Sequence, residues 1–180
     1  IVTGIDAEGV SIGADRIAAR TVLWAAGVSA NPIAKSLGAP LDRAGRVQVR
    51  PDLTVPGHPE IQVAGDLAAF SQEDRNVSGV APFAIQTGRH AAANVERVLR
   101  GEAPQPFRYV DKGSLATIGR AAAVVDFGSL RYTGFIAWVI WLGAHILFLI
   151  GFRNRMLVLM EWAWSYWTYD RGARLITDRR

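Results

Sequence analysis

The stretch that decides the fold is Ile61-Gln62-Val63-Ala64-Gly65-Asp66-Leu67-Ala68. Its apolar residues lead into a glycine and an aspartate, which predicts a short buried strand that ends where the backbone passes close to another group. Because an unpaired buried carboxylate is costly, Asp66 needs donors within reach, and ribose or ribityl hydroxyls would serve. The same pattern also fits an ordinary strand end whose aspartate caps a helix, and both interpretations stay open.

Strand and helix patterns alternate on both sides of this stretch up to residue 100. The expected elements are a β-meander at 1–22, an apolar strand at 21–28, a short helix at 32–37, a half-exposed strand at 46–50, a polar loop at 71–79 and a helix from 82 to about 99. Asn31 is suited to cap the short helix, and Gly38 is suited to end it. The alternation indicates part of an α/β sheet.

Beyond residue 100 the composition changes. Three short strands are expected at 107–110, 114–119 and 122–127, followed by two helices at about 130–151 and 156–169. Residues 131–180 carry seven arginines against three acidic residues, whereas residues 1–130 carry thirteen charges of each sign. Because this basic excess lies beside the most apolar segment, it indicates a lipid surface as partner, and not nucleic acid.

The apolar run FIAWVIWLGAHILFLIGF occupies residues 135–152 and contains no formal charge. Roughly eighteen apolar residues are the lower limit for crossing a bilayer. Glu161 and the tryptophans of the second helix favour a helical pair that lies in the membrane interface over a transmembrane hairpin. A buried dimer-interface helix is a third interpretation, compatible with the first.

Cysteine and histidine usage limits the chemistry of the chain. It has no cysteine, which excludes disulfides and thiolate metal sites. His58, His90 and His145 are not spaced as metal ligands, so no metal site is expected. No signal peptide or nucleophile signature is present. The first residues read as the inside of a strand and lack an initiating methionine, from which we expect an incomplete chain.

Five segments in order resemble the C-terminal half of type II NADH dehydrogenase, a single-subunit flavoprotein that reduces membrane quinone. They are TVLWAAGV at 21–28, VAGD at 63–66, SGVAPFAIQ at 78–86, DKGSLATIG at 111–119 and GFRNR at 151–155. The resemblance implies the C-terminal half of an α/β flavoprotein with two dinucleotide-binding domains, followed by membrane-associated helices. By domain, it assigns 1–20 to the end of the NADH domain and the crossover, 21–100 to the second half of the FAD domain, 101–129 to a small β region and 130–180 to the membrane-associating region.

The resemblance also implies roles for individual residues. Asp66, after Gly65, matches the aspartate that binds the ribityl and pyrophosphate part of FAD. The residues that match other positions near the flavin are Ala26, Gly27, Ala84 and Ile85. Gln86 matches the second glutamine of the quinone-site pattern, whereas the first falls on Pro82, a departure that weakens the assignment. Lys112 matches a lysine near the flavin and quinone cleft, although a solvated turn lysine is an equal alternative.

The chain contains no Gly-x-Gly-x-x-Gly loop, so we expect it not to bind FAD or NADH normally by itself. The implied activity, electron transfer from NADH through FAD to quinone without proton pumping, is therefore that of a longer protein at the cytoplasmic face of the bacterial inner membrane. A homodimer through the C-terminal helices is compatible with these expectations. Two alternatives remain: a related flavoprotein with another electron acceptor, and a non-catalytic membrane-attached module.

Overall fold

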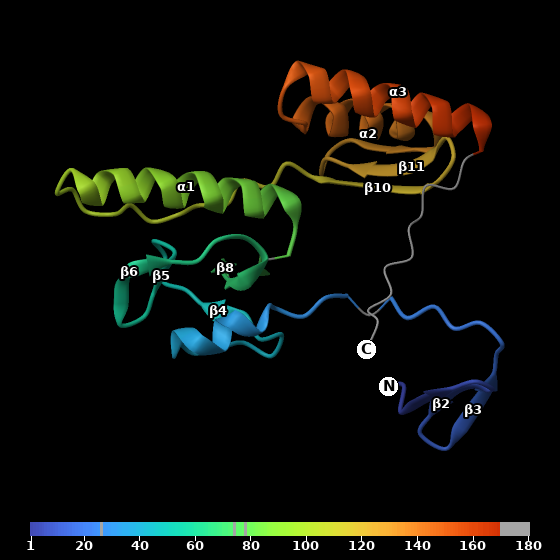
Figure 1. The fold of residues 1–180 in the computed structure, drawn as a ribbon, viewed down its shortest axis with the longest axis horizontal. Helices are drawn as coiled ribbons and strands as arrows, with labels where there is room; N and C mark the ends of the chain where they lie inside the picture. The colour runs from blue at the N-terminus through green and yellow to red at the C-terminus, as the bar shows by residue number, and fades with distance from the viewer. Residues whose placement is uncertain (26, 74, 78, 170–180) are drawn as a thin grey trace. The chain divides into compact units, whose positions relative to one another are not determined.

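The computed structural model describes residues 1–25, 27–73, 75–77 and 79–169. The chain divides into two compact units, residues 1–109 and 110–180, and each is described here by itself (Figure 1). The observed secondary structure is a mixture of short strands and three α-helices in the described residues. The expectation of an α/β protein is therefore confirmed at this level.

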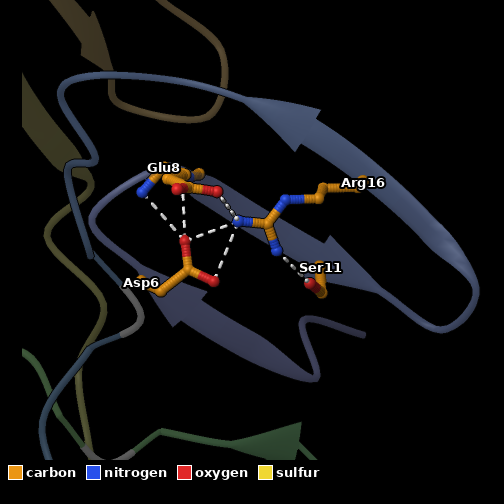
Figure 2. A network of polar contacts seen from close by, with 5 residues as sticks. Asp6, Glu8, Ser11 and Arg16 are labelled. Atoms are coloured by element: carbon orange, nitrogen blue, oxygen red, sulfur yellow. Dashed lines mark hydrogen bonds and ion pairs between the residues drawn. The ribbon is translucent and has the colours of Figure 1, made fainter.

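The first unit begins with an antiparallel meander of β1 (Gly4–Asp6), β2 (Gly9–Ile12) and β3 (Asp15–Ala18), which confirms the expected strands. Figure 2 shows the polar network that ties it together: Arg16 Nη2 contacts both carboxylate oxygens of Asp6, at 2.7 and 2.9 Å, and Glu8 at 3.6 Å. The bond from Arg16 is the main reason that the pKa of Asp6 is lowered. All these groups are exposed, so the network fixes a surface ribbon.

The apolar strand expected at 21–28 is not formed in the described part of that segment. Leu23 and Val28 are each 89% exposed. A strand is stable only when a neighbour completes its backbone ladder, and among the described residues no strand pairs with this segment. The residue pattern predicted a strand from composition alone, but composition does not supply the neighbouring strand.

The short helix at Pro32–Leu37 forms as expected, as a 3₁₀-helix (η1). Asn31 Oδ1 accepts a hydrogen bond from the Ile33 amide at 3.0 Å. Gly38 ends the helix with a φ of 63°, a left-handed conformation that glycine adopts without a Cβ penalty.

The parallel sheet is reduced to one pair, β4 (Val47–Gln48) beside β7 (Ala68–Ala69). The expected strand at Ile61 begins earlier, because β6 (His58–Gln62) forms an antiparallel hairpin with β5 (Thr54–Val55). Its first three residues are exposed, so the expectation of a buried strand is wrong for β6. Burial begins only at Val63, after the strand. Two further short strands, β8 (Ser71–Gln72) and β9 (Arg75–Asn76), pair where a loop was expected.

Helix α1 (Ala81–Leu99) forms as expected and covers the core of this unit. Its fully buried residues are Phe83, Thr87 and Asn94. The centre of the Phe83 ring lies 5.9 Å from the centre of the Phe107 ring and 6.0 Å from the centre of the Tyr109 ring. Such tilted aromatic pairs add to the free energy gained by burial alone. The other buried apolar residues of this core are Ala34, Val47, Leu53, Val55, Val63, Ala68 and Phe70.

Two polar clamps fasten residues 105–109 to this core. The Asn94 side chain donates to the Gln105 carbonyl at 2.9 Å and accepts from the Gln105 amide at 2.9 Å. The Gln72 side chain makes the same pair of bonds with the Tyr109 backbone, at 3.2 and 2.8 Å. Residues 107–110 do not form the strand expected from their pattern, because the Tyr109 backbone is bonded to the Gln72 side chain and the Phe107 amide donates to the Pro51 carbonyl.

The second unit is a three-stranded antiparallel sheet of β10 (Ser114–Gly119), β11 (Ala122–Asp126) and β12 (Arg131–Thr133). Two of its strands confirm the expectation, and the third lies after residue 130. Helix α2 (Gly134–Phe148) lies on one face of the sheet and α3 (Phe152–Thr168) packs on α2 (Figure 1). The core is small, with Ala123, Val125 and Ala137 buried.

Helices α2 and α3 are held together by aromatic contacts. The Trp141 and Trp162 rings are stacked with their centres 5.3 Å apart, and the centres of the Trp138 and Tyr166 rings lie 5.5 Å apart. The break between the two helices lies at residues 149–151, and Gly151 has a φ of 82°. The expectation that residues 152–155 form the break is therefore wrong, since α3 begins at Phe152. In the described residues no helix combines the length and apolar character needed to cross a membrane.

Candidate functional site

The stretch at residues 61–68, which decides the fold, contains a tight turn in the first unit. Val63 is buried, Gly65 has a φ of 67°, and Gly65–Leu67 make a single 3₁₀ turn (η2) before β7. Only glycine adopts this backbone without strain. The turn is therefore fixed by local sequence at the residue that precedes Asp66.

Thr87 anchors this turn to α1. The Gly65 amide donates to Thr87 Oγ1 at 3.0 Å, and that hydroxyl lies 2.8 Å from the Phe83 carbonyl, to which it donates. Thr87 is fully buried, so its hydroxyl has no solvent partner to replace these bonds. A Cβ added at Gly65 would lie 3.5 Å from Ala84 Cβ, which places the glycine directly against the first turn of the helix.

Asp66 itself is exposed, which corrects the expectation of a buried carboxylate. Among the described residues, no hydrogen bond or ion pair is found for its side chain. Its charge therefore needs no protein partner to be tolerated in this structure, because water solvates it. What the structure does provide is a carboxylate acceptor at a rigid position, beside the first two turns of α1.

The start of α1 adds donors to this surface. Val80 occupies the N-cap position without a side-chain cap, and the first turn contains no acidic residue. The first amides of a helix lack intrahelical acceptors and carry the positive end of its dipole. Ile85 is 40% exposed and Gln86 is half-buried. A carboxylate acceptor and a positive helix end together suit a ligand that carries both hydroxyls and negative charge.

Two further predicted residues, Ala26 and Gly27, precede this turn in the sequence. Ala26 lies outside the described residues. Gly27 has a φ of 86° and is exposed, and nothing lies within 4 Å of where its Cβ would be. The described structure therefore groups Gly65, Asp66 and Ala84, and it does not test the role of the residues at 26–27.

Lys112 belongs to the second unit and lies in a turn just before β10. Asp111 Oδ1 accepts from the Gly113 amide at 2.8 Å, which fixes the backbone on both sides of the lysine. Gly113 has a φ of 87°, and a Cβ there would lie 2.3 Å from the Asp126 carbonyl oxygen. Lys112 is exposed. Its ammonium group is thus carried by a rigid turn and faces solvent in this unit.

The sequence reasoning missed Thr87 as part of the site. A threonine on the buried face of a helix can donate to the carbonyl one turn earlier and still accept one bond. A tight glycine turn has a backbone amide that needs such an acceptor. The combination of a buried helical threonine with a tight glycine turn is therefore the signal that would have identified Thr87.

A hollow in the described structure lies elsewhere in the first unit. It has a volume of about 480 Å³ and none of the predicted site residues line it; its lining residues are Asp42, Gln48, Val49, Pro51, Ala69, Phe70, Ser71 and Asn76. No group of three metal-ligating side chains is found in the ranges that the structure covers. The candidate site is therefore an open surface around a rigid turn.

Comparison with known proteins assigns both units. Residues 3–89 match the family described as pyridine nucleotide-disulphide oxidoreductase. Residues 112–168 match the family described as NDH2 C-terminal domain. The Gly65–Asp66 turn and the start of α1 lie in the first match, and Lys112 and both C-terminal helices lie in the second.

Individual relatives agree with these matches. The chain is 40% identical to Ndh of Mycobacterium tuberculosis, a type II NADH:quinone oxidoreductase, over 100% of this chain and 41% of the relative. It is also 40% identical to NdhA of the same organism, over 99% of this chain and 40% of the relative. A type II NADH:quinone oxidoreductase of Staphylococcus haemolyticus is 36% identical over 58% of this chain and 26% of the relative. The chain spans about two-fifths of the length of its M. tuberculosis relatives. The chain therefore resembles the C-terminal part of the type II NADH:quinone oxidoreductases.

Proposed function

We propose that this chain is the C-terminal part of a flavin-dependent enzyme that transfers electrons from NADH to a membrane quinone. The observation that carries the proposal is the Gly65–Asp66 turn, which Thr87 fixes against the start of α1. The names of the relatives, all type II NADH:quinone oxidoreductases, support the reaction. The proposal concerns the longer protein, since the nucleotide-binding loops are not in these residues.

The residues present fit an FAD site. The exposed Asp66 carboxylate would accept hydrogen bonds from the hydroxyls of the cofactor, and the glycine before it keeps the backbone open to close approach. Ala84 and Ile85 lie at the positive start of α1, which would stabilise negative charge near them. By the family resemblance, Ala26 and Gly27 would complete this site. When bound, FAD would supply the redox chemistry, taking a hydride from NADH and passing two electrons to quinone.

Two polar side chains would serve the quinone. Gln86 follows directly after the flavin-facing residues of α1 and would hydrogen-bond a quinone carbonyl. Lys112 would donate to the same class of oxygen from its rigid turn. In the reaction a quinone oxygen gains electron density, so donors aimed at it would lower the energy of that charge.

The second unit would hold the enzyme at the cytoplasmic face of the bacterial inner membrane. Large apolar residues are exposed on α3, including Met160 at 63%, Trp164 at 67% and Trp167 at 83%. Residues 131–180 carry the whole positive excess of the chain. Tryptophan and arginine together suit the interface of a bilayer that contains anionic lipid. This contact would bring the second unit to the apolar phase in which the insoluble quinone tail is dissolved.

The test replaces Asp66 in the protein that contains this chain. D66N keeps the size of the side chain but removes its charge, and we expect the bound flavin, read from visible absorbance, to fall at least about tenfold. E96Q is the matched control, because Glu96 is another exposed carboxylate, on α1 near its far end. Unchanged flavin content in D66N, or a wild-type protein that stays colourless with added FAD, would contradict the proposal.

A further inference from the structure

All of the sulfur in this chain lies on one helix. The sequence contains no cysteine and two methionines, Met156 and Met160, and both belong to α3. They are four residues apart, so their side chains lie on the same side of the helix, one turn apart. The chain therefore has a single place where a mild two-electron oxidant meets a sulfur atom.

That place is the side of α3 that faces away from α2. The side toward α2 contains Trp162, which stacks on Trp141, and the half-buried Val158 and Ser165. On the opposite side, at helical spacing, are Met156, Met160, Trp164 and Trp167, with exposures of 37%, 63%, 67% and 83%. We call these four residues the outer face of α3. It is apolar throughout, and the two thioethers form its first half.

Oxidation changes the chemistry of this face at two points. Hydrogen peroxide transfers one oxygen atom to a thioether: its O–O bond breaks, an S=O bond forms, sulfur loses two electrons and water is released. The product, methionine sulfoxide, is polar and accepts hydrogen bonds, and reductases can convert it back. A sulfoxide on the outer face therefore costs free energy in an apolar environment but little in water.

We infer that Met156 and Met160 form a reversible oxidation site that controls contact of the outer face with lipid. The inference rests on the lipid contact in the proposed function and adds its regulation. Oxidation of either sulfur replaces an apolar contact by a polar group that a bilayer interface accepts poorly. Peroxide then shifts the protein from the membrane to solution, and sulfoxide reduction returns it.

The exposures set an order of events. Met160 is 63% exposed and Met156 is 37% exposed, so the sulfur of Met160 meets dissolved peroxide more often. Lipid that covers the outer face shields both. Peroxide therefore acts on the unbound protein and prevents its return, and added vesicles slow the oxidation.

The experiment treats the chain with hydrogen peroxide and measures co-sedimentation with vesicles of phosphatidylglycerol and phosphatidylcholine in equal parts. Peptide masses report the oxidation of each methionine. We expect oxidised chain to lose vesicle affinity by about tenfold per sulfoxide, the effect of withdrawing one apolar side chain from the contact. Methionine sulfoxide reductase restores the affinity, and M156L/M160L keeps it under peroxide. Leucine is a good helix former, and a far-ultraviolet spectrum verifies that the variant is folded.

Three results are decisive. Untreated chain that does not sediment with vesicles overturns the lipid contact, and with it the switch built on that contact. Untreated chain that binds, with oxidised chain binding equally, overturns the switch alone. Loss of binding that persists in peroxide-treated M156L/M160L, or that the reductase fails to reverse in the wild type, assigns the effect to other residues and also overturns the switch.

Discussion

Helices α1 and α3 are similar in length, 19 and 17 residues, yet they use their apolar residues in opposite ways. Three residues of α1 are fully buried, and one of them, Phe83, is at the centre of an aromatic core. None of the described residues of α3 is buried, and two of its three tryptophans, Trp164 and Trp167, lie on the outer face. The first helix completes a core, whereas the second presents a surface.

The difference teaches that apolar content alone does not distinguish a core helix from a docking helix. What distinguishes them is whether the apolar side chains meet a partner in the same unit. In α1 that partner is the segment at 105–109, held by the clamps on Asn94 and Gln72. In α3 only the stripe against α2 is covered, by aromatic stacking.

The strongest test of this contrast truncates one apolar side chain on each helix. We expect F83A to destabilise the first unit by about 3–5 kcal/mol, because it leaves a cavity among rings that contact one another. M160A removes an exposed side chain of α3 and should change stability by less than about 0.5 kcal/mol. Hydrogen exchange of the amides of each helix reports the two units separately. Equal losses in both variants would show that α3 also has a buried core.

A second test compares two glycines with left-handed backbone, one in each unit. G113A should destabilise the second unit by about 3 kcal/mol or more, because its Cβ would meet the Asp126 carbonyl at 2.3 Å in a strained conformation. In G65A the nearest atom to the new Cβ is Ala84 Cβ at 3.5 Å, an ordinary contact, so we expect a cost of about 1 kcal/mol, from the backbone alone.

Tryptophan fluorescence measures the first of these variants well, since five of the six tryptophans follow residue 135. G65A is measured by exchange of the α1 amides. The expected order of the two losses of stability would be wrong if G65A proved more destabilising than G113A. The turn before Asp66 would then be under backbone strain that the contacts of Gly65 do not show.

The pH dependence of the first unit is expected to arise in part from Asp42. Burial alone would raise the pKa of this carboxyl, but hydrogen bonds from the Arg46 backbone and side chain outweigh it and hold the pKa below the usual 3.8. The folded state therefore gains stability above pH 3.8 and loses it as the pH falls through the lowered pKa. D42N lacks this contribution.

We expect D42N to cost about 1–2 kcal/mol at neutral pH and close to nothing at about pH 2. Urea unfolding of both proteins across this range, followed by exchange in the first unit, measures the difference. A penalty that stays constant with pH would show that the introduced carboxamide disturbs packing and that the lost charge is not responsible.

The smallest expected effect concerns the end of α3. Arg120, in the turn between β10 and β11, donates to the carbonyls of Ser165 and Tyr166 and lies 3.9 Å from the centre of the Tyr169 ring. A cation at a helix C-terminus is stabilising. R120A should therefore weaken the last turn of α3 by about 1 kcal/mol, seen as faster exchange of its final amides.

R131A is the matched control, because Arg131 pairs with Asp126 on the same sheet and has no described contact with α3. Similar exchange at the end of α3 in both variants would mean that Arg120 does not hold the helix. Together with the comparison of F83A and M160A, the R120A and R131A variants separate the contacts that hold α3 in its unit from the role of its outer face.

Local signals predicted much of the fold. The short helix at 32–37 followed from its cap and its glycine, and α1 from its proline start and length. Such elements contain most of their own determinants in a few neighbouring residues. The family resemblance was confirmed by the matches over residues 3–89 and 112–168 and by a relative that is 40% identical over 100% of this chain.

What failed depends on neighbours that the pattern does not name. Residues 21–28 have strand composition but pair with no strand in the described structure. Residues 107–110 are held by bonds to the Gln72 side chain and to the Pro51 carbonyl, and they join no sheet. The exposure of Asp66 was likewise invisible, because burial of one residue is set by the packing of others around it.

The clamp between Gln72 and Tyr109 has a practical consequence for cutting the gene. A fragment that stops at Leu99, where the helix ends, would discard Phe107 and Tyr109 and uncover the ring of Phe83. Such a product would invite aggregation during expression. A stop codon placed after Val110 keeps Phe107 and Tyr109, which cover the Phe83 ring. The useful cloning boundary therefore lies after the loop that follows α1, and not at the end of the helix.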